Sequence, residues 1–243
     1  MSTAAIPRRR TWRCSEEQIA VAVFIVLAAV PVFAGGYLVY VLPQYMLYGI
    51  LAMSLVLIWG FAGILSFGQS AFFAVGGYAI GLALKHGGPI DPALLGILGA
   101  IAAGAALAAL CGYFLFSAGV RGMYFVLVTL ALSIMTTQIA TSQSAITGGF
   151  NGMFVQRISL RLPGGSQLPL NGDAAMYFFV LGVVVIVYFI LRGLRLSRFG
   201  KVLIGIRENE DRALALGYRA SLYKTAAFTL SGALAALAGA LYA

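Results

Sequence analysis

The residues of this chain that could do chemistry are few, and most of them are gathered in one charged stretch. Between Arg192 and Lys224 lie half of the chain's 16 Lys and Arg residues and three of its 7 Asp and Glu residues. A charged stretch bounded on both sides by apolar sequence is typical of the place where a membrane protein meets water. We therefore expect the segment from Leu191 to Thr225 to be the most informative part of the chain about its function.

Catalytic and metal-binding patterns are missing from the rest of the sequence. The single histidine, His86, stands in a predicted loop, and no Ser-His-Asp set or HExxH motif occurs. Cys14 and Cys111 have neither the spacing of a disulfide framework nor neighbouring metal ligands. Lys201 follows a glycine but precedes Val202 instead of the Ser or Thr of a P-loop. The sequence thus predicts no catalytic residue, no metal and no cofactor.

Composition predicts an all-α, polytopic integral membrane helix bundle. The chain is 61% hydrophobic and 9% charged, with a mean hydropathy of +0.96, whereas soluble domains average about 25% charged residues. Lipid must therefore cover most of its surface. The net charge of +9 does not indicate nucleic-acid binding, because the basic residues flank apolar runs, as the positive-inside bias requires.

The apolar runs predict about seven membrane spans, since a helix needs about 20 apolar residues to cross a bilayer. The first could instead be a cleaved signal peptide, but its length and the spans behind it favour a retained anchor, kinked at Pro31. The predicted spans are residues 19–41, 45–65, 67–84, 92–117, 123–140, 174–191 and 225–243.

Basic residues predict the orientation of these spans. With the N-terminal arm, residues 1–18, in the cytoplasm, 13 of the 16 Lys and Arg fall on inner segments and 3 on outer ones. Residues 19–243 then form the transmembrane domain, with a cytoplasmic loop over 192–224. The turn over 65–70 is very apolar, so it is either a short inner turn or a broken helix within the bilayer.

A polar and glycine-rich segment surrounds that turn. Glycines such as Gly77 and Gly81 suit close helix packing. Polar side chains beside a helix break at membrane depth must be satisfied by protein or water, and such groups tend to line a cavity. The spans as drawn contain no Asp or Glu, which argues against proton-coupled transport. The candidate translocation-path residues are Ser66, Gln69 and Ser70 with Thr129 and Ser133 of the fifth span.

A second glycine-rich motif lies in the long outer loop. It predicts a tight turn with left-handed residues. It is either a structural turn or a gate or docking surface at the outer mouth, and turn chemistry alone favours the first. Its residues are Thr147, Gly148, Gly149, Asn151 and Gly152.

Within the charged stretch, residues 207–218 predict one short cytoplasmic helix. Its acids stand near the start, Glu208 and Arg212 form an i,i+4 pair, and Gly217 ends it. An apolar patch, residues 202–206, precedes it. Basic residues that only fix topology explain Arg192 and Arg195, but not the acidic cluster and the apolar patch.

The segment from Asp211 to Gly217, DRALALG, resembles the E-A-A-x-x-x-G signature of permeases in ATP-binding-cassette importers. A narrower resemblance, to the permeases of branched-chain amino acid importers of the LivM type, runs in order from Tyr45 to Ala243. The matching segments are 63–78, 121–125, 147–152, 197–200, 206–210, 215–217, 223–224, 230–231 and 238–242.

The resemblance implies an inner-membrane importer for branched-chain or other amino acids. Its partners would be a second, LivH-like permease subunit, two cytoplasmic ATPase subunits that hydrolyse ATP, and a periplasmic substrate-binding protein. Family members continue beyond the equivalent of Ala243, so we expect the chain to be truncated at its C-terminus. The residues expected to couple to the ATPase are Arg207, Glu208, Asn209, Glu210, Asp211, Ala215 and Gly217.

Two further functions stay open at this level. Permeases for urea or short amides share the same loop, so the solute is not fixed. A secondary transporter or channel would need no ATPase, and its charged loop would only set topology.

Overall fold

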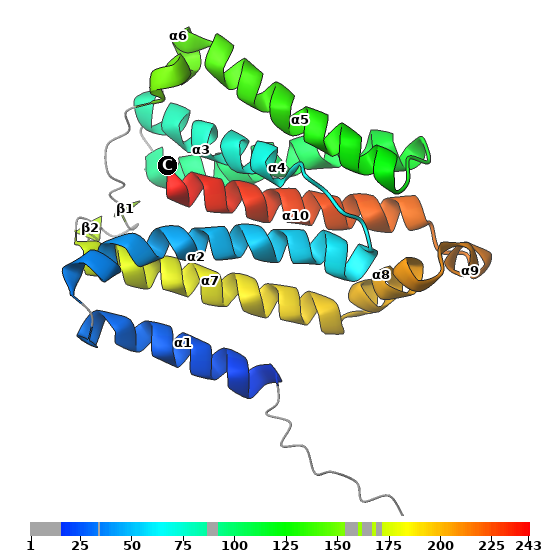
Figure 1. Ribbon diagram of the computed structural model, residues 1–243, viewed down its shortest axis with the longest axis horizontal. Helices are drawn as coiled ribbons and strands as arrows, with labels where there is room; N and C mark the ends of the chain where they lie inside the picture. Colours follow the sequence, from blue (N-terminus) through cyan, green and yellow to red (C-terminus); the bar gives the residue numbers. More distant parts are fainter. Residues whose placement is uncertain (1–15, 34, 87–91, 154–159, 162–166, 169–171) are drawn as a thin grey trace, which may run out of the picture.

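Long helices lie side by side in the computed structural model, which describes residues 16–33, 35–86, 92–153, 160–161, 167–168 and 172–243 (Figure 1). The long helices are α1 (Glu16–Phe33), α2 (Gly36–Val56), α3 (Gln69–His86), α4 (Pro92–Ser117), α5 (Met123–Ser142), α7 (Asp173–Leu196) and α10 (Ala220–Tyr242). The shorter elements are η1 (Leu57–Phe61), α6 (Ser144–Thr147), η2 (Gly149–Asn151), α8 (Arg198–Glu208), α9 (Glu210–Ala215) and the antiparallel strands β1 (Leu160–Arg161) and β2 (Gln167–Leu168). The predicted all-α membrane bundle is confirmed.

Five of the seven predicted spans correspond to helices that could cross a membrane. Among the described residues, the helices long and apolar enough are Gly36–Phe61, Pro92–Ser117, Met123–Ser142, Asp173–Leu196 and Ala220–Tyr242. The apolar part of α1, Gln18–Phe33, is shorter than these. The helix α3 has 18 residues, begins only at Gln69, and ends on Lys85 and His86. Of the about seven predicted spans, with a broken or re-entrant helix allowed for one of them, five are thus long and apolar enough in this part of the chain, and α3 is the third span, predicted to be shorter.

The boundary between the first two spans differs from the prediction. The run 19–41 is not one helix, because α1 ends at Phe33 and α2 begins at Gly36. Gly35 has an extended backbone, with φ −61° and ψ 158°. Two adjacent glycines break the helix here, and apolarity on both sides conceals the break from a hydropathy profile. The second span then runs from Gly36 to Phe61, well before the predicted start at 45.

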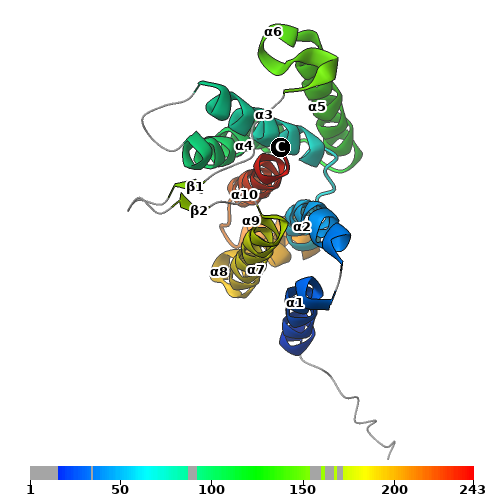
Figure 2. The same cartoon turned by 90° about the vertical axis from the view of Figure 1, so that its left-hand side faces the viewer.

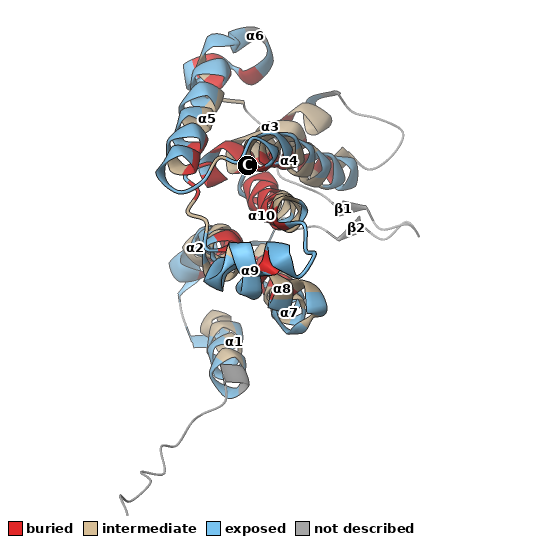
Figure 3. Cartoon of the chain, turned by 90° about the vertical axis from the view of Figure 1, so that its right-hand side faces the viewer, coloured by how far each residue is buried: buried red, intermediate tan, exposed pale blue. Residues whose placement is uncertain are grey.

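The centre of the bundle is α10, which packs against α4, α3 and α2 (Figures 1 and 3). Small side chains make this possible, because glycine and alanine let helix backbones approach closely. On α4, every fourth residue is small and buried over a stretch of nearly five turns. These residues are Gly96, Ala100, Gly104, Ala108 and Gly112. The facing residues of α10 include Gly232 and Ala236, while Gly239 approaches α3.

Larger apolar side chains join α2 to α7. Leu47 and Ile50 of α2 lie in one buried cluster with Tyr177, Val180 and Val187 of α7. The helix α1 lies outside this pair, where the Tyr177 hydroxyl donates a hydrogen bond to the Leu27 carbonyl at 2.6 Å. At the opposite edge of the bundle α5 lies mostly outside the packed core, as Figure 2 shows. Both edge helices leave apolar side chains on the surface for lipid or protein to cover.

Three of the four predicted inner segments meet at one end of the bundle, and the fourth, residues 1–18, lies almost wholly outside the described residues. The end of α2, the turn between α4 and α5, the helices α8 and α9 and the start of α10 all gather there (Figure 1). The helix α6 and the start of α7 lie at the other end. The clustering that the basic residues predict is therefore present in the tertiary structure.

Candidate functional site

The span that follows α2 is broken inside the bundle. After the π-helical turn η1, Gly63 turns the chain with a φ of +71°, and residues 63–66 have no regular secondary structure. The chain then returns into the bundle, because Gln69 at the start of α3 contacts Ser54 of α2, two turns before the end of η1. The helix is therefore broken after η1, beside α2 and α10, and the position of this break within the bilayer stays a prediction.

Gln69 joins three helices at this depth. Its Nε2 donates to the Ser231 Oγ of α10 at 2.9 Å, and its Oε1 accepts from the Ser54 Oγ at 3.2 Å. The Ser231 Oγ in turn donates to the Ser54 carbonyl at 2.6 Å. All three side chains are buried. Polar groups at membrane depth need partners within the protein, and each of these has one.

The helix α5 holds the irregular backbone from the other side. The Phe67 amide donates to the Thr129 Oγ1 at 3.2 Å, and the Ser133 Oγ donates to the Phe67 carbonyl at 2.7 Å. The Ser70 Oγ donates to the Ser133 Oγ at 2.9 Å. The Ser66 Oγ accepts from the Gly68 amide at 3.1 Å. The structure thus brings all five predicted path residues together, where their hydroxyl and amide groups satisfy one another and the backbone.

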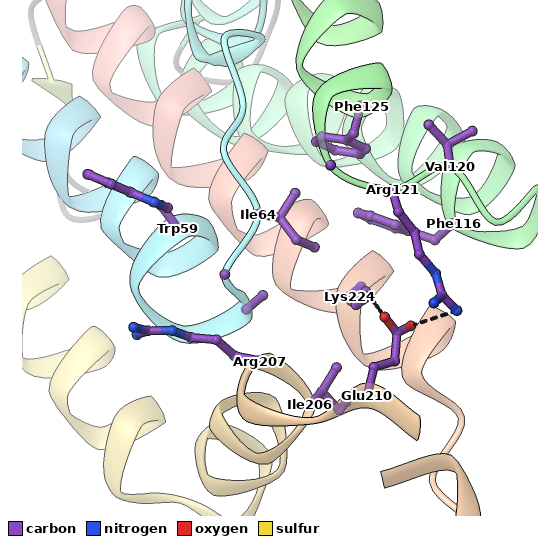
Figure 4. A pocket seen from close by; sticks show the side chains of 13 residues that line it. Trp59, Ile64, Phe116, Val120, Arg121, Phe125, Ile206, Arg207, Glu210 and Lys224 are labelled. Carbon is purple, nitrogen blue, oxygen red and sulfur yellow. Dashed lines mark ion pairs between the residues drawn. The ribbon is translucent and has the colours of Figure 1, made fainter. Parts of the chain in front are cut away.

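A cavity of about 460 Å³ opens at the inner end, where Gly63 and Ile64 lead into the break (Figure 4). Its wall is apolar along η1, α4 and α5, and its mouth is charged. The Glu210 carboxylate lies 2.8 Å from the Lys224 Nζ and 3.6 Å from an Arg121 guanidinium nitrogen. The lining residues are Trp59, Ala62, Gly63, Ile64, Phe116, Val120, Arg121, Gly122, Phe125, Ile206, Arg207, Glu210 and Lys224.

The predicted single helix over 207–218 is wrong, because Asn209 divides it into α8 and α9. Asn209 has an extended backbone, and its Oδ1 accepts from the Arg212 amide at 2.9 Å. This is an N-cap, in which the side chain satisfies an amide that has no partner within the helix. The preceding apolar patch is not offered to a partner as a whole, since Leu203 and Ile206 are buried in the protein.

The predicted coupling residues form two groups, according to whether their side chains are exposed or make contacts within the protein. Glu208, Asp211, Ala215 and Gly217 are exposed at the end of the bundle (Figure 3). Arg207, Asn209 and Glu210 use their side chains within the protein. The Arg207 guanidinium donates to the Gly60 carbonyl, Asn209 caps α9, and Glu210 forms the two ion pairs. Gly217, with a φ of +87°, lies just after α9, where the helix was predicted to end.

The glycine-rich outer motif forms the compact turn that its sequence predicts. Gly148, Gly149 and Gly152 have φ values of +77°, +62° and +70°. The Thr147 hydroxyl donates to the Ala140 and Gln143 carbonyls at the end of α5, and accepts from the Gly149 amide. Asn151 is exposed on this turn, and beside it Phe150 is 93% exposed. The turn is therefore fixed to α5 and presents an apolar side chain outward.

Comparison of the sequence with models of known protein families identifies the family of this chain. The model described as "Branched-chain amino acid transport system / permease component" matches residues 37–243. The chain belongs to this family of permeases. The match covers the broken span, the inner cavity, the segment α8–α9 and the outer turn.

Curated relatives agree with the family assignment. The permease is 28% identical over 242 residues to the "High-affinity branched-chain amino acid transport system permease protein LivM" of Escherichia coli (strain K12). It is 27% identical over 241 residues to the protein of the same name from Salmonella typhimurium (strain LT2). These alignments cover 92% and 91% of this chain and 56% of each relative, so the chain spans little more than half their length. No solved structure matches it.

Sequence reasoning missed four polar residues of this permease's site. Ser54 and Ser231 hold Gln69, and Arg121 and Lys224 hold Glu210. A signal existed for Ser54 and Ser231, since a serine within an apolar span must find a partner in the protein. For Arg121 and Lys224, the topology signal of a basic residue next to a span concealed their second role.

Proposed function

We propose that this chain is a permease subunit of an ATP-binding-cassette importer, which moves branched-chain or other amino acids across the bacterial inner membrane. The observation that carries the proposal is the exposed face of α9, with Asp211 and Ala215, at the end where α2, α10 and the α4–α5 turn meet. A helix in this position can receive a movement from outside and pass it to the span helices. Membership of the permease family supports the same function.

The partners follow from this function. A second, LivH-like permease subunit completes the path, two cytoplasmic ATPase subunits bind and hydrolyse ATP, and a periplasmic binding protein delivers the solute. The N-terminal arm lies in the cytoplasm, and lipid covers the outer apolar surfaces. Glu208, Asp211, Ala215 and Gly217 contact the ATPase, since they are exposed, whereas the side chains of Arg207, Asn209 and Glu210 bond within the protein. The outer turn with Phe150 faces the binding protein.

The broken span provides the path for the solute. Ser66, Gln69, Ser70, Thr129 and Ser133 gather where an irregular backbone runs between the helices of the bundle. Irregular backbone at membrane depth is found where it is buried in protein or lines a water-filled cavity. The inner cavity begins at Gly63 and Ile64, directly before this segment, and supplies the exit.

The experiment uses the full chain co-expressed with its permease, ATPase and binding-protein partners and reconstituted in proteoliposomes. We expect uptake of labelled leucine that requires ATP and the binding protein. Glu208→Lys and Gly217→Trp, which change the exposed surface at α9, should reduce co-purification of the ATPase. The matched control is Lys85→Glu, a charge reversal at the other end of the bundle. If the ATPase co-purifies unchanged with both Glu208→Lys and Gly217→Trp, the assignment of this surface to ATPase contact is wrong.

Two outcomes of the uptake assay would indicate a different function. Uptake that persists without ATP and disappears with an ion gradient would indicate a secondary transporter or channel. ATP-driven uptake of urea or acetamide, with no uptake of leucine, would retain the importer and replace its solute.

A further inference from the structure

One of the predicted coupling residues, Glu210, faces the inside of the protein. Its side chain is 22% exposed, and its carboxylate meets Lys224 at 2.8 Å and Arg121 at 3.6 Å (Figure 4). The neighbouring Asp211 is exposed. The two adjacent acids of α9 therefore point to different partners, and Glu210 joins α9 to α10 and to the α4–α5 turn.

The Lys224 pair is the stronger of the two contacts. The Lys224 side chain is only 11% exposed, whereas that of Arg121 is 60% exposed. An exposed pair contributes little because water and salt screen it. A buried cation without its partner is strongly unfavourable, since the protein cannot replace its hydration. Any movement of α9 that took Glu210 away from Lys224 would therefore be resisted, and α10 would move with α9 instead.

Lys224 lies on the same face of α10 as the polar cluster. Ser231, which accepts from Gln69, is seven residues further along, so about two helical turns and 10 Å separate the two side chains. A second connection runs along α2. The Arg207 guanidinium donates to the Gly60 carbonyl, and Ser54, six residues earlier, donates to Gln69. Both helices that hold Gln69 are thus joined to the α8–α9 segment at their inner ends.

We propose that Glu210 is a positioning residue that transmits the movement of α9 to α10, and through Ser231 to the broken span, instead of contacting the ATPase. This inference rests on the proposed function. In the transport cycle the ATPase displaces the exposed face of α9, and the Glu210–Lys224 ion pair makes α10 follow. The bonds of Gln69 to Ser231 and Ser54 then change together, which alters the polar segment that the solute passes.

The test measures ATP hydrolysis and solute uptake separately in the reconstituted complex. Glu210→Gln removes the ion pair and leaves the surface of α9 in place. We expect hydrolysis to stay near the wild-type rate while the uptake per ATP falls about tenfold, which is typical of a lost coupling. The charge exchange Glu210→Lys with Lys224→Glu should restore uptake, whereas Glu210→Lys alone should not. Lys201→Gln, on the exposed face of α8, is the matched control and should behave as the wild type.

A second variant distinguishes a loss of coupling between α9 and α10 from a failure of the complex to fold. Glu210→Gln with Lys224→Met replaces the pair by neutral side chains of similar size, so no buried charge is left alone and the complex should assemble. We expect this variant to hydrolyse ATP with the same tenfold loss of uptake. Normal uptake per ATP in this variant would overturn the inference, as would normal uptake in Glu210→Gln. A wild-type complex without ATP-driven uptake would instead refute the proposed function.

Discussion

The contact between α3 and α10 gives a sharp test, because Gly239 leaves no room for a side chain. A Cβ added at Gly239 would overlap the Phe73 carbonyl oxygen and would lie 2.7 Å from the Phe73 carbonyl carbon and 3.0 Å from the Phe73 Cα, where ordinary contacts begin at 3.4 Å. The obstacle is backbone of α3, which cannot rotate away as a side chain can. Gly239→Ala must therefore separate the two helices by at least 0.7 Å, the difference between 3.4 and 2.7 Å.

This separation reaches the polar cluster. Phe73 is one turn from Gln69, so the same shift would lengthen the bond from the Gln69 Nε2 to the Ser231 Oγ from 2.9 Å to about 3.6 Å. Overpacking costs about 1–3 kcal/mol, and a weakened buried hydrogen bond adds about 1 kcal/mol. The gain in helix propensity from Gly to Ala is about 1 kcal/mol and opposes these terms. We expect a net destabilisation of about 1–3 kcal/mol.

The assay is equilibrium unfolding of the purified protein in mixed micelles with increasing SDS. The matched control is Gly182→Ala on α7, where an added Cβ meets nothing within 4 Å. We expect the control to be neutral or slightly stabilised, and Gly239→Ala to unfold at a lower SDS fraction. Equal midpoints for the two variants would refute the close approach of α3 and α10, and with it the placement of Gln69 against Ser231.

Three further predictions concern the hydrogen bonds of the site. Gln69→Leu should reduce uptake about tenfold, measured in proteoliposomes. It should change the free energy of unfolding by less than about 1 kcal/mol, measured from the SDS midpoint, because the Ser54 and Ser231 hydroxyls still donate to backbone carbonyls. Asn209→Ala removes the N-cap of α9 and should destabilise that helix by about 1 kcal/mol, seen as faster amide hydrogen exchange in α9. Ser133→Ala leaves a bond to the Phe67 carbonyl unmade and should lower the free energy of unfolding by about 1 kcal/mol.

Each of these has a control in the same chain. Gln44→Leu removes an exposed amide of α2 that bonds the Tyr242 hydroxyl, and should leave uptake unchanged. Asn209→Asp keeps a capping oxygen and should keep slow exchange. Thr137→Val removes a hydroxyl that bonds only within α5, and should cost less than Ser133→Ala. Loss of uptake in Gln44→Leu, fast exchange in Asn209→Asp, or equal costs for the two α5 variants would contradict the respective argument.

Sequence patterns predict the fold class and the grouping of segments because both depend on local, additive properties. Hydropathy over about 20 residues identifies spans, and it does so for α4, α5, α7 and α10. It is wrong about residues 19–41, where two glycines break a helix without changing apolarity. It also cannot tell a turn at the membrane surface from one at membrane depth, since residues 63–68 carry no charge in either case.

The tertiary structure decides where the break lies among the helices and in which direction the charged side chains point. Gln69 and Ser231 are 162 residues apart, and no local pattern connects them. Glu210 and Asp211 are adjacent and chemically alike, and only the packing of α9 against α10 turns one toward Lys224 and leaves the other exposed. The sequence by itself determined that this is a helical membrane protein with one charged, helical segment, because composition and local periodicity control these features. Which residue of that segment faces inward depends on contacts between distant elements, and these exist only in the folded chain.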